Sequence, residues 1–335
     1  MIRIDGSYGE GGGQILRTAV ALSCVTGKEV EIYNIRANRP NPGLAAQHLK
    51  GIEAAKLISN AEVEGLKLGS TRVIFRPKTL KGGTFKIDIG TAGSVTLVLQ
   101  TILPPSIVAE KESTFEITGG TDVAWSPPID YFRFVTLKAL KELGAEMNIV
   151  LIKRGYYPKG GGKIEVHVKP SKLTGKEFLK KMDEKIFGIS HCQNLPINVA
   201  ERQAKAAKDW LRKMGLAADI KVERSEGIST GSGITIWSSY KGGSALGEKG
   251  KRAEIVGEEA AKEFYREFTS DSVMDSKLAD QIMVFAVLAN SETRYTTSEI
   301  TLHQKSNAYV INTFFNDAIS INEQKKEIHI RGAKF

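Results

Sequence analysis

The sequence predicts an α/β (α+β) protein in which one structural unit occurs three times. Three segments of the 335-residue chain show the same order of patterns: an apolar helix, a short strand, a second helix and then alternating strands. The stretch 173–273 does not follow this order, so it is predicted to be a smaller, inserted α/β domain. Strands that alternate with pairs of helices are typical of layered folds. We therefore expect a large domain of three repeats at 1–172 and 274–335.

Within each repeat, apolar periodicity predicts a helix, a strand and a second helix. These elements are expected at 13–23, 29–35 and 41–58, at 91–102, 113–117 and 128–143, and at 278–289, 296–302 and 306–318. Closing strands are expected at 72–76 and 84–89, at 147–153 and 163–168, and at 327–331. Packing around a pseudo-threefold axis would bring the residues after the three middle strands to one cleft. Those residues are 36–39, 119–122 and 303–306.

The inserted stretch has its own elements. Helices are predicted at 200–214 and 253–268, and strands at 219–223 and 233–238. Its glycine-rich segment 241–247 is similar to a phosphate-binding loop, but Glu248 stands where the lysine of such a loop would be. This segment is therefore predicted to be a hairpin connection.

Composition restricts the class of protein. An apolar fraction of 41% and a charged fraction of 25% are normal for a globular protein with a sizeable core. The chain has no apolar run long enough for a membrane span and does not begin like a signal peptide, so a cytoplasmic protein without membrane contact is expected. Two distant cysteines indicate neither a disulfide framework nor a zinc site. The net charge of +9 favours a polyanionic partner.

The segment 5–17 places five glycines among acidic, amide and guanidinium side chains, directly before an apolar helix. Glycine lets another group approach the backbone closely, and a helix start offers unpaired N–H donors. An anion or a nucleotide would bind at such a segment. A tight strand-to-helix turn without a ligand fits the glycines equally well.

The five histidines differ in their surroundings. His167 and His329 alternate with apolar residues in strands, His48 lies in a helix where a packed or capping role is usual, and His191 falls in the insert. His303 follows a predicted apolar strand and precedes a polar turn that opens a helix. Because strand ends that lead into loops often carry functional residues, His303 is the candidate base or nucleophile.

Seven blocks of the chain together resemble the RNA 3′-terminal phosphate cyclase family. The first reads Asp-Gly-x-x-Gly-Glu-Gly-Gly-Gly-Gln-Ile-Leu-Arg, and the last reads His-x-x-Ser-Asn. In order along nearly the whole chain, the blocks are 5–17, 35–39, 90–100, 119–122, 155–162, 278–281 and 303–307. The resemblance implies three βαβαββ repeats with an inserted small domain. It also implies ATP-dependent conversion of an RNA 3′-terminal phosphate to a 2′,3′-cyclic phosphodiester, with release of AMP and pyrophosphate.

The resemblance assigns roles to individual residues. His303 would form a covalent histidine-AMP, from which AMP passes to the RNA end as an RNA-ppA intermediate. Arg17, Arg36 and Arg39 would clamp phosphates, and Glu10 would hold Mg²⁺ or Mn²⁺. Gln14 would orient a phosphate. The adenosine site would consist of Gln100, Lys277, Leu278, Ala279, Asp280 and Gln281, with Lys277 in a place that is aromatic in some relatives.

Two alternatives share this fold. Cyclase-like proteins that act in ribosome assembly bind RNA without cyclising it, and they lack the nucleophilic histidine, so His303 favours an enzyme. Enolpyruvyl transferases also repeat a βαβαββ unit, but more often and without a covalent histidine. The expected partners are ATP and RNA with a 3′-phosphate end, and a homodimer is left open.

Overall fold

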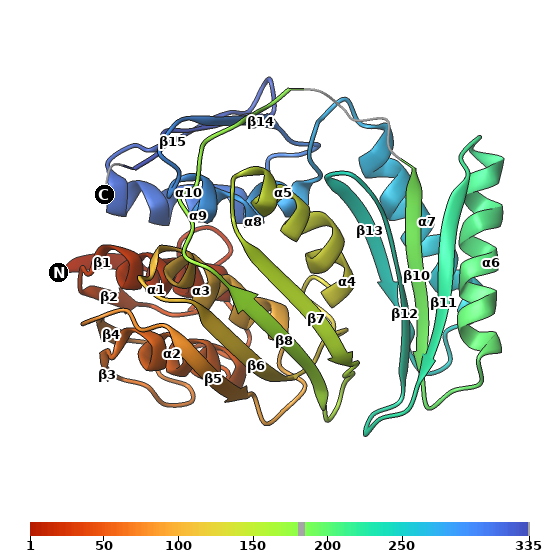
Figure 1. The fold of residues 1–335 in the computed structure, drawn as a ribbon, viewed down its shortest axis with the longest axis horizontal. Helices are drawn as coiled ribbons and strands as arrows, with labels where there is room; N and C mark the ends of the chain where they lie inside the picture. Colours follow the sequence, from red (N-terminus) through yellow and green to blue (C-terminus); the bar gives the residue numbers. More distant parts are fainter. Residues whose placement is uncertain (180–184, 334–335) are drawn as a thin grey trace.

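The computed structural model describes residues 1–179 and 185–333 and confirms the α+β class. Its strands form four sheets of four strands each (Figure 1). Three of these sheets belong to the repeats, and the fourth belongs to the insert. In every repeat the first and second strands pair in parallel, and the strand order within the sheet is first, second, fourth, third.

The first repeat runs from the N-terminus to residue 76. Its elements are β1 (Ile2–Asp5), α1 (Gly13–Thr26), β2 (Val30–Tyr33), α2 (Ala46–Ser59), β3 (Glu62–Glu64) and β4 (Val73–Arg76). The second repeat comprises β5 (Gly83–Asp88), α3 (Val95–Val108), β6 (Ser113–Gly119), α4 (Ile129–Tyr131), a π-helical turn (Phe132–Thr136), α5 (Leu137–Glu142), β7 (Met147–Lys153) and β8 (Gly162–Val168). The predicted strand 84–89 therefore opens the second repeat instead of closing the first, because β5 pairs with β6.

The third repeat is interrupted by the insert. It consists of β9 (Glu177–Phe178), α8 (Ser276–Gln281), α9 (Met283–Ala286), β14 (Thr293–Thr296), α10 (Leu302–Phe315), β15 (Ile319–Asn322) and β16 (Glu327–Ile330). Strand β9 lies within the predicted insert 173–273 but pairs with β14 of the large domain. The other boundaries of the two domains stay predictions.

The prediction of a strand at 296–302 is wrong. The strand ends at Thr296, and helix α10 begins at Leu302. The reason is a capping box: the hydroxyl of Thr301 accepts a hydrogen bond from the N–H of Gln304, and the Gln304 side chain bonds back to Thr301. His303 therefore lies in the first turn of a helix and not at the end of a strand.

The insert is a sheet covered by two helices. Its elements are β10 (Ile186–Gln193), α6 (Asn198–Lys213), β11 (Ala218–Ser225), β12 (Gly231–Ser238), β13 (Lys241–Leu246) and α7 (Ala253–Thr269). Both helices pack on one face of the sheet (Figure 1) and enclose a small core of their own. On β12, Trp237 stacks on Phe134 of the large domain, with ring centroids 4.4 Å apart.

The glycine-rich segment 241–247 is a strand, so the prediction of a hairpin connection is wrong. Most of it forms β13, which is antiparallel to β12. Its glycines allow close packing, since a Cβ on Gly243 would lie 2.2 Å from the backbone nitrogen of Phe264 in α7. Substitution there would force strand and helix apart.

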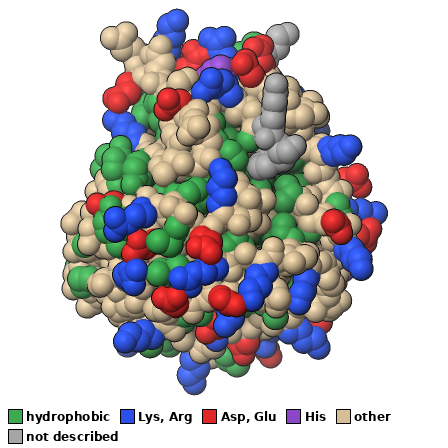
Figure 2. All heavy atoms as spheres, turned by 90° about the vertical axis from the view of Figure 1, so that its left-hand side faces the viewer, with side chains coloured by type: hydrophobic (Ala, Val, Ile, Leu, Met, Phe, Trp, Pro, Cys, Tyr) green, Lys and Arg blue, Asp and Glu red, His purple; other side chains and the backbone are tan. Residues whose placement is uncertain are grey.

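Among the residues that the structure describes, no helix is both long and apolar enough to cross a membrane. Figure 2 shows lysine and arginine side chains interspersed with acidic ones on the face that carries the first repeat. On this face the charge is mixed and not gathered into one basic patch.

Candidate active site

The glycine-rich loop between β1 and α1 is closely approached by two other elements. Gly9 and Gly11 have φ of 59° and 57°, values that favour glycine. A Cβ on Gly9 would lie 2.7 Å from the Ser306 hydroxyl of α10, and a Cβ on Gly13 would lie 2.1 Å from Nε2 of His48 in α2. The glycines thus allow α2 and α10 each to approach the start of α1 closely. No side chain caps that start, so its N–H groups face the loop.

His303 of α10 contacts Glu10 of the glycine-rich loop at the place where α1, α2 and α10 come together, which is called the junction. Nε2 of His303 lies 3.1 Å from Oε2 of Glu10, and the same oxygen accepts a hydrogen bond of 3.2 Å from Arg39. About half of the His303 side chain is exposed. The structure therefore brings together the predicted nucleophile, the predicted metal ligand and one predicted phosphate clamp, although His303 and Glu10 are 293 positions apart.

Asp280 on α8 lies on the other side of the imidazole. Its Oδ2 is 4.0 Å from Nδ1 of His303, and its Oδ1 accepts hydrogen bonds from Gln14 and, at 2.7 Å, from Asn307. Burial raises the pKa of this carboxyl group, while the neighbouring His303 acts against that rise. Gln14 also donates to the backbone carbonyl of His303 at 3.1 Å. Asp280 thus belongs to a network that holds the histidine in place.

Two arginines line the junction from the first repeat. Arg17 in α1 donates from Nε to Oε1 of Gln100 at 3.1 Å, which links it to the second repeat. Burial lowers the pKa of Arg17 to about 10, so it stays charged at neutral pH. Arg36 donates to the carbonyl oxygen of Gly43 at 2.9 Å, and burial together with the charge of Arg39 lowers its pKa. These guanidinium groups suit bidentate contacts with phosphate.

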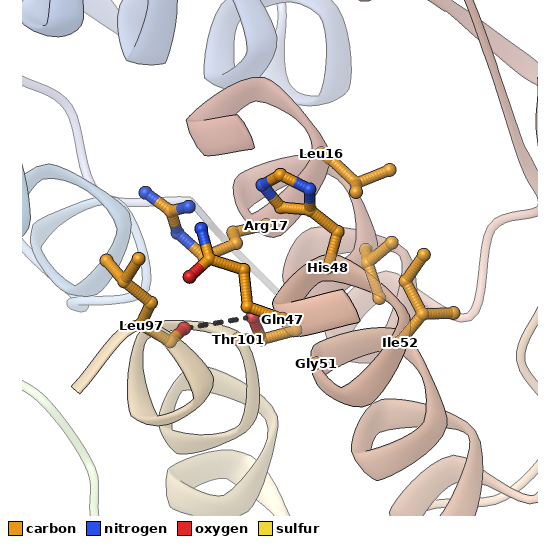
Figure 3. A pocket seen from close by; sticks show the side chains of 9 residues that line it. Leu16, Arg17, Gln47, His48, Gly51, Ile52, Leu97 and Thr101 are labelled. Atoms are coloured by element: carbon orange, nitrogen blue, oxygen red, sulfur yellow. Dashed lines mark hydrogen bonds between the residues drawn. The ribbon is translucent and has the colours of Figure 1, made fainter. Parts of the chain in front are cut away.

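His48 has the capping role that its position predicts. Its Nδ1 accepts a hydrogen bond of 3.1 Å from the N–H of Ala45. Burial, with the charges of Arg17 and Arg36, lowers its pKa to about 3. His48 therefore stays neutral at physiological pH. Figure 3 shows His48 with Arg17 and Gln47 around a cavity of about 10 Å³, about the size of one water molecule.

The segment 277–281 contributes unequally. Lys277 is partly exposed and forms an ion pair of 2.7 Å with Glu263 of the insert. Leu278 and Ala279 are buried in the core. Gln281 is buried as well, and its Oε1 accepts a hydrogen bond of 2.9 Å from Thr136. Of these side chains, Asp280 approaches His303, whereas Lys277 is held by the insert.

Asn307 is a site residue that received no role from the sequence. Its Nδ2 donates to Asp280, and its Oδ1 accepts a hydrogen bond of 2.6 Å from Thr18. Asn307 follows His303 by four positions, so it occupies the same face of α10 one turn later. The sequence signal that could have pointed to Asn307 is its place in the last family block, His-x-x-Ser-Asn.

The chain is similar to known proteins over nearly its whole length. A family model described as RNA 3′-terminal phosphate cyclase matches residues 8–321. An RNA 3′-terminal phosphate cyclase of Archaeoglobus fulgidus is 62% identical over 97% of this chain and 99% of its own length. An RNA 3′-terminal phosphate cyclase of Pyrobaculum aerophilum is 50% identical over 96% of this chain and 95% of its own length. The match to a solved EPSP synthase of Acinetobacter baumannii covers 99% of this chain and 65% of that protein, at 12% identity and with a TM-score of 0.31. The chain belongs to the RNA 3′-terminal phosphate cyclase family.

Proposed function

We propose that this protein uses ATP to convert an RNA 3′-terminal phosphate into a 2′,3′-cyclic phosphodiester through a histidine-AMP intermediate. The observation that supports this most is the position of His303. It lies beside Glu10 and Arg39, near the start of α1, where no side chain caps the N–H groups that could bind an anion. A cyclase-like protein that only binds RNA has no need of such a histidine.

The reaction has three displacements at phosphorus. First, Nε2 of His303 attacks the α-phosphorus of ATP, an N–P bond forms and pyrophosphate leaves. An oxygen of the RNA 3′-phosphate then attacks the same phosphorus and breaks the N–P bond, which restores His303. Finally, the neighbouring 2′-oxygen attacks the RNA phosphate, its proton is lost and AMP leaves. The last step is intramolecular, an advantage that reaches roughly 7–11 kcal/mol in well-oriented systems.

Nucleophilic attack needs a free lone pair on Nε2. A carboxylate on the Nδ1 side, Asp280, favours the tautomer with its proton on Nδ1. The contact between Nε2 and Glu10 has to open before attack. Binding of substrate phosphates near Arg39 would compete for the guanidinium that now holds Glu10 and so help to release this carboxylate.

The donor set fits a divalent cation that is held chiefly by phosphate oxygens. Among the described residues, no cluster of three or more histidine, cysteine or acidic side chains could hold a metal ion. A single carboxylate, Glu10, is what Mg²⁺ or Mn²⁺ requires when substrate phosphates complete its coordination. Such a cation would neutralise phosphate charge, while Arg17, Arg36 and Arg39 neutralise the rest.

The test is labelling of the protein with ATP that carries radioactive phosphorus at the α-position. The label should be acid-labile, present in the wild type and absent in His303→Ala. His167→Ala is the matched control, because this histidine is also 49% exposed but lies on β8. Label that persists in His303→Ala would refute the assignment of the nucleophile.

Ring closure is tested separately with RNA. After incubation with ATP, a 3′-phosphate should become resistant to phosphatase, and a matched RNA with a 2′-deoxy end should stop at the adenylated intermediate. Equal cyclisation of both ends would contradict the role of the 2′-oxygen. RNA binding without any labelling by ATP would favour the non-catalytic alternative.

A further inference from the structure

The loop between β6 and α4 carries a tryptophan that is almost fully exposed. The side chain of Trp125 is 99% exposed, and its φ of 64° is a left-handed backbone conformation that bulky residues rarely adopt. Tyr157, in the loop between β7 and β8, is 77% exposed. Neither side chain is buried in the core, so core packing does not explain why an aromatic residue occupies these positions. A strained backbone that presents an aromatic ring to solvent indicates a surface that binds a ligand or a partner molecule.

The Trp125 loop is rigidly anchored. The buried guanidinium of Arg154 bonds Asp122 at 3.3 Å and Asp130 at 2.7 Å, so one side chain fastens both ends of the loop. The same guanidinium bonds Glu223 of the insert at 2.8 Å. A loop that is held in advance loses little backbone freedom when a partner stacks on its aromatic side chain.

The two aromatic loops share this anchor. The N–H groups of Thr121 and Asp122 both donate to the carbonyl oxygen of Gly155, at 2.8 and 3.1 Å. Gly155 follows Arg154 directly and lies two residues before Tyr157. Lys159, two residues further, is exposed and adds positive charge. Trp125, Tyr157 and Lys159 are exposed residues of two loops that are joined at this backbone contact, and we call these three residues the aromatic platform.

The platform adjoins the candidate active site. The Thr96 hydroxyl donates to the carbonyl oxygen of Pro127 at 2.8 Å, which fixes the Trp125 loop to the first turn of α3. Gln100 lies one turn further along this helix, about 6 Å away, and accepts the hydrogen bond from Arg17. A short run of nucleotides would span the distance between the platform and the phosphate clamp.

We propose that the aromatic platform stacks an unpaired base of the RNA substrate upstream of its 3′-phosphate, a proposal that rests on RNA being the substrate. Aromatic rings bind bases through their faces without regard to sequence, and a nearby lysine suits the sugar-phosphate backbone. The platform would therefore select single-stranded ends without reading their sequence.

The test is direct binding of a 5′-fluorescein RNA with a single-stranded 3′-phosphate end, measured by anisotropy without ATP. Trp125→Ala should weaken binding about 5- to 150-fold, which corresponds to the ~1–3 kcal/mol of one base–aromatic stack. Trp125→Phe should retain most of the affinity. The control is Leu68→Ala, because this residue is 66% exposed in the loop between β3 and β4. An affinity of Trp125→Ala within twofold of the wild type would overturn the proposal.

Intrinsic fluorescence provides a second readout. The chain has three tryptophans, of which Trp210 and Trp237 are partly buried against Tyr265 and Phe134. RNA should quench the emission of the wild type and of Trp210→Phe, but not that of Trp125→Phe. Quenching by ATP alone would show that the ring stacks the adenine of ATP, and this would overturn the proposal.

Two further results separate this proposal from its rivals. Labelling by ATP without RNA should be the same in Trp125→Ala as in the wild type, and a parallel loss would place the ring in the nucleotide site instead. A wild type that forms dimers while Trp125→Ala is monomeric, with equal RNA affinity, would assign the platform to a second copy of this chain. Failure of the histidine-AMP chemistry would leave the binding measurement unaffected, so the two proposals fail separately.

Discussion

Moderate acid should destabilise this protein through His48. The pKa of this histidine is about 3 in the folded chain against an ordinary value of 6.5. The unfolded chain therefore binds the proton first, and the stability due to the neutral ring is lost as the pH falls from about 6.5 towards 3. Each unit of pKa difference is worth about 1.36 kcal/mol. Between pH 8 and pH 5, His48 should lower the free energy of unfolding by ~2 kcal/mol.

The assay is urea unfolding at pH 8 and at pH 5, followed by circular dichroism. His191 is also buried with a lowered pKa, so the wild type alone does not isolate His48. The informative quantity is the difference from His48→Asn, whose amide is neutral at both values of pH and can still accept from Ala45. The wild type should lose ~2 kcal/mol more than the variant between pH 8 and 5. Equal losses would refute the view that burial, together with the charges of Arg17 and Arg36, holds His48 neutral by lowering its pKa.

Two further substitutions test the packing around the site. In Gly13→Ala, the new Cβ would lie 2.1 Å from Nε2 of His48, so the ring must shift; we expect a loss of ~1–3 kcal/mol in urea unfolding together with weaker labelling by ATP. Unchanged labelling would contradict the close approach of α2 to the glycine-rich loop. Arg154→Ala would leave Asp122 buried without its guanidinium partner and Asp130 with Arg133 alone, and should cost ~3–5 kcal/mol by the same assay. A loss below about 1 kcal/mol would mean that the carboxyl groups find other partners or take up protons.

Apolar periodicity predicts elements better than it predicts their partners. The helix expected at 200–214 is α6, and the strand expected at 147–153 is β7, because each has a clear apolar pattern. The strand expected at 84–89 is β5, but its assignment to the first repeat is wrong. It pairs with β6, which lies more than 20 residues further along the chain. Local spacing carries no information about which sheet a strand joins.

The wrong prediction of a strand at 296–302 could have been avoided from the sequence itself. Thr301 and Gln304 have the spacing of a capping box, which marks the start of a helix. The partners of His303 had no such signal. Glu10 and Asp280 reach it from β1–α1 and from α8, and only the packing of three repeats brings these segments to one place. Sequence alone supplied the candidate residues through resemblance, and the structure supplied their geometry.

The three repeats share one topology, yet the position after the second strand of each repeat does different work. In the first repeat it carries Arg39, which bonds Glu10, the carboxylate that contacts His303. In the second it carries Asp122, which bonds Arg154 and anchors the loop of Trp125. In the third it leads to the Thr301 cap that starts the helix of His303. Equivalent positions of one topology thus carry side chains with different contacts: Arg39 bonds Glu10, Asp122 anchors a loop and Thr301 caps a helix. The position in the second repeat is therefore where we expect substitutions to change RNA affinity while leaving reaction with ATP intact.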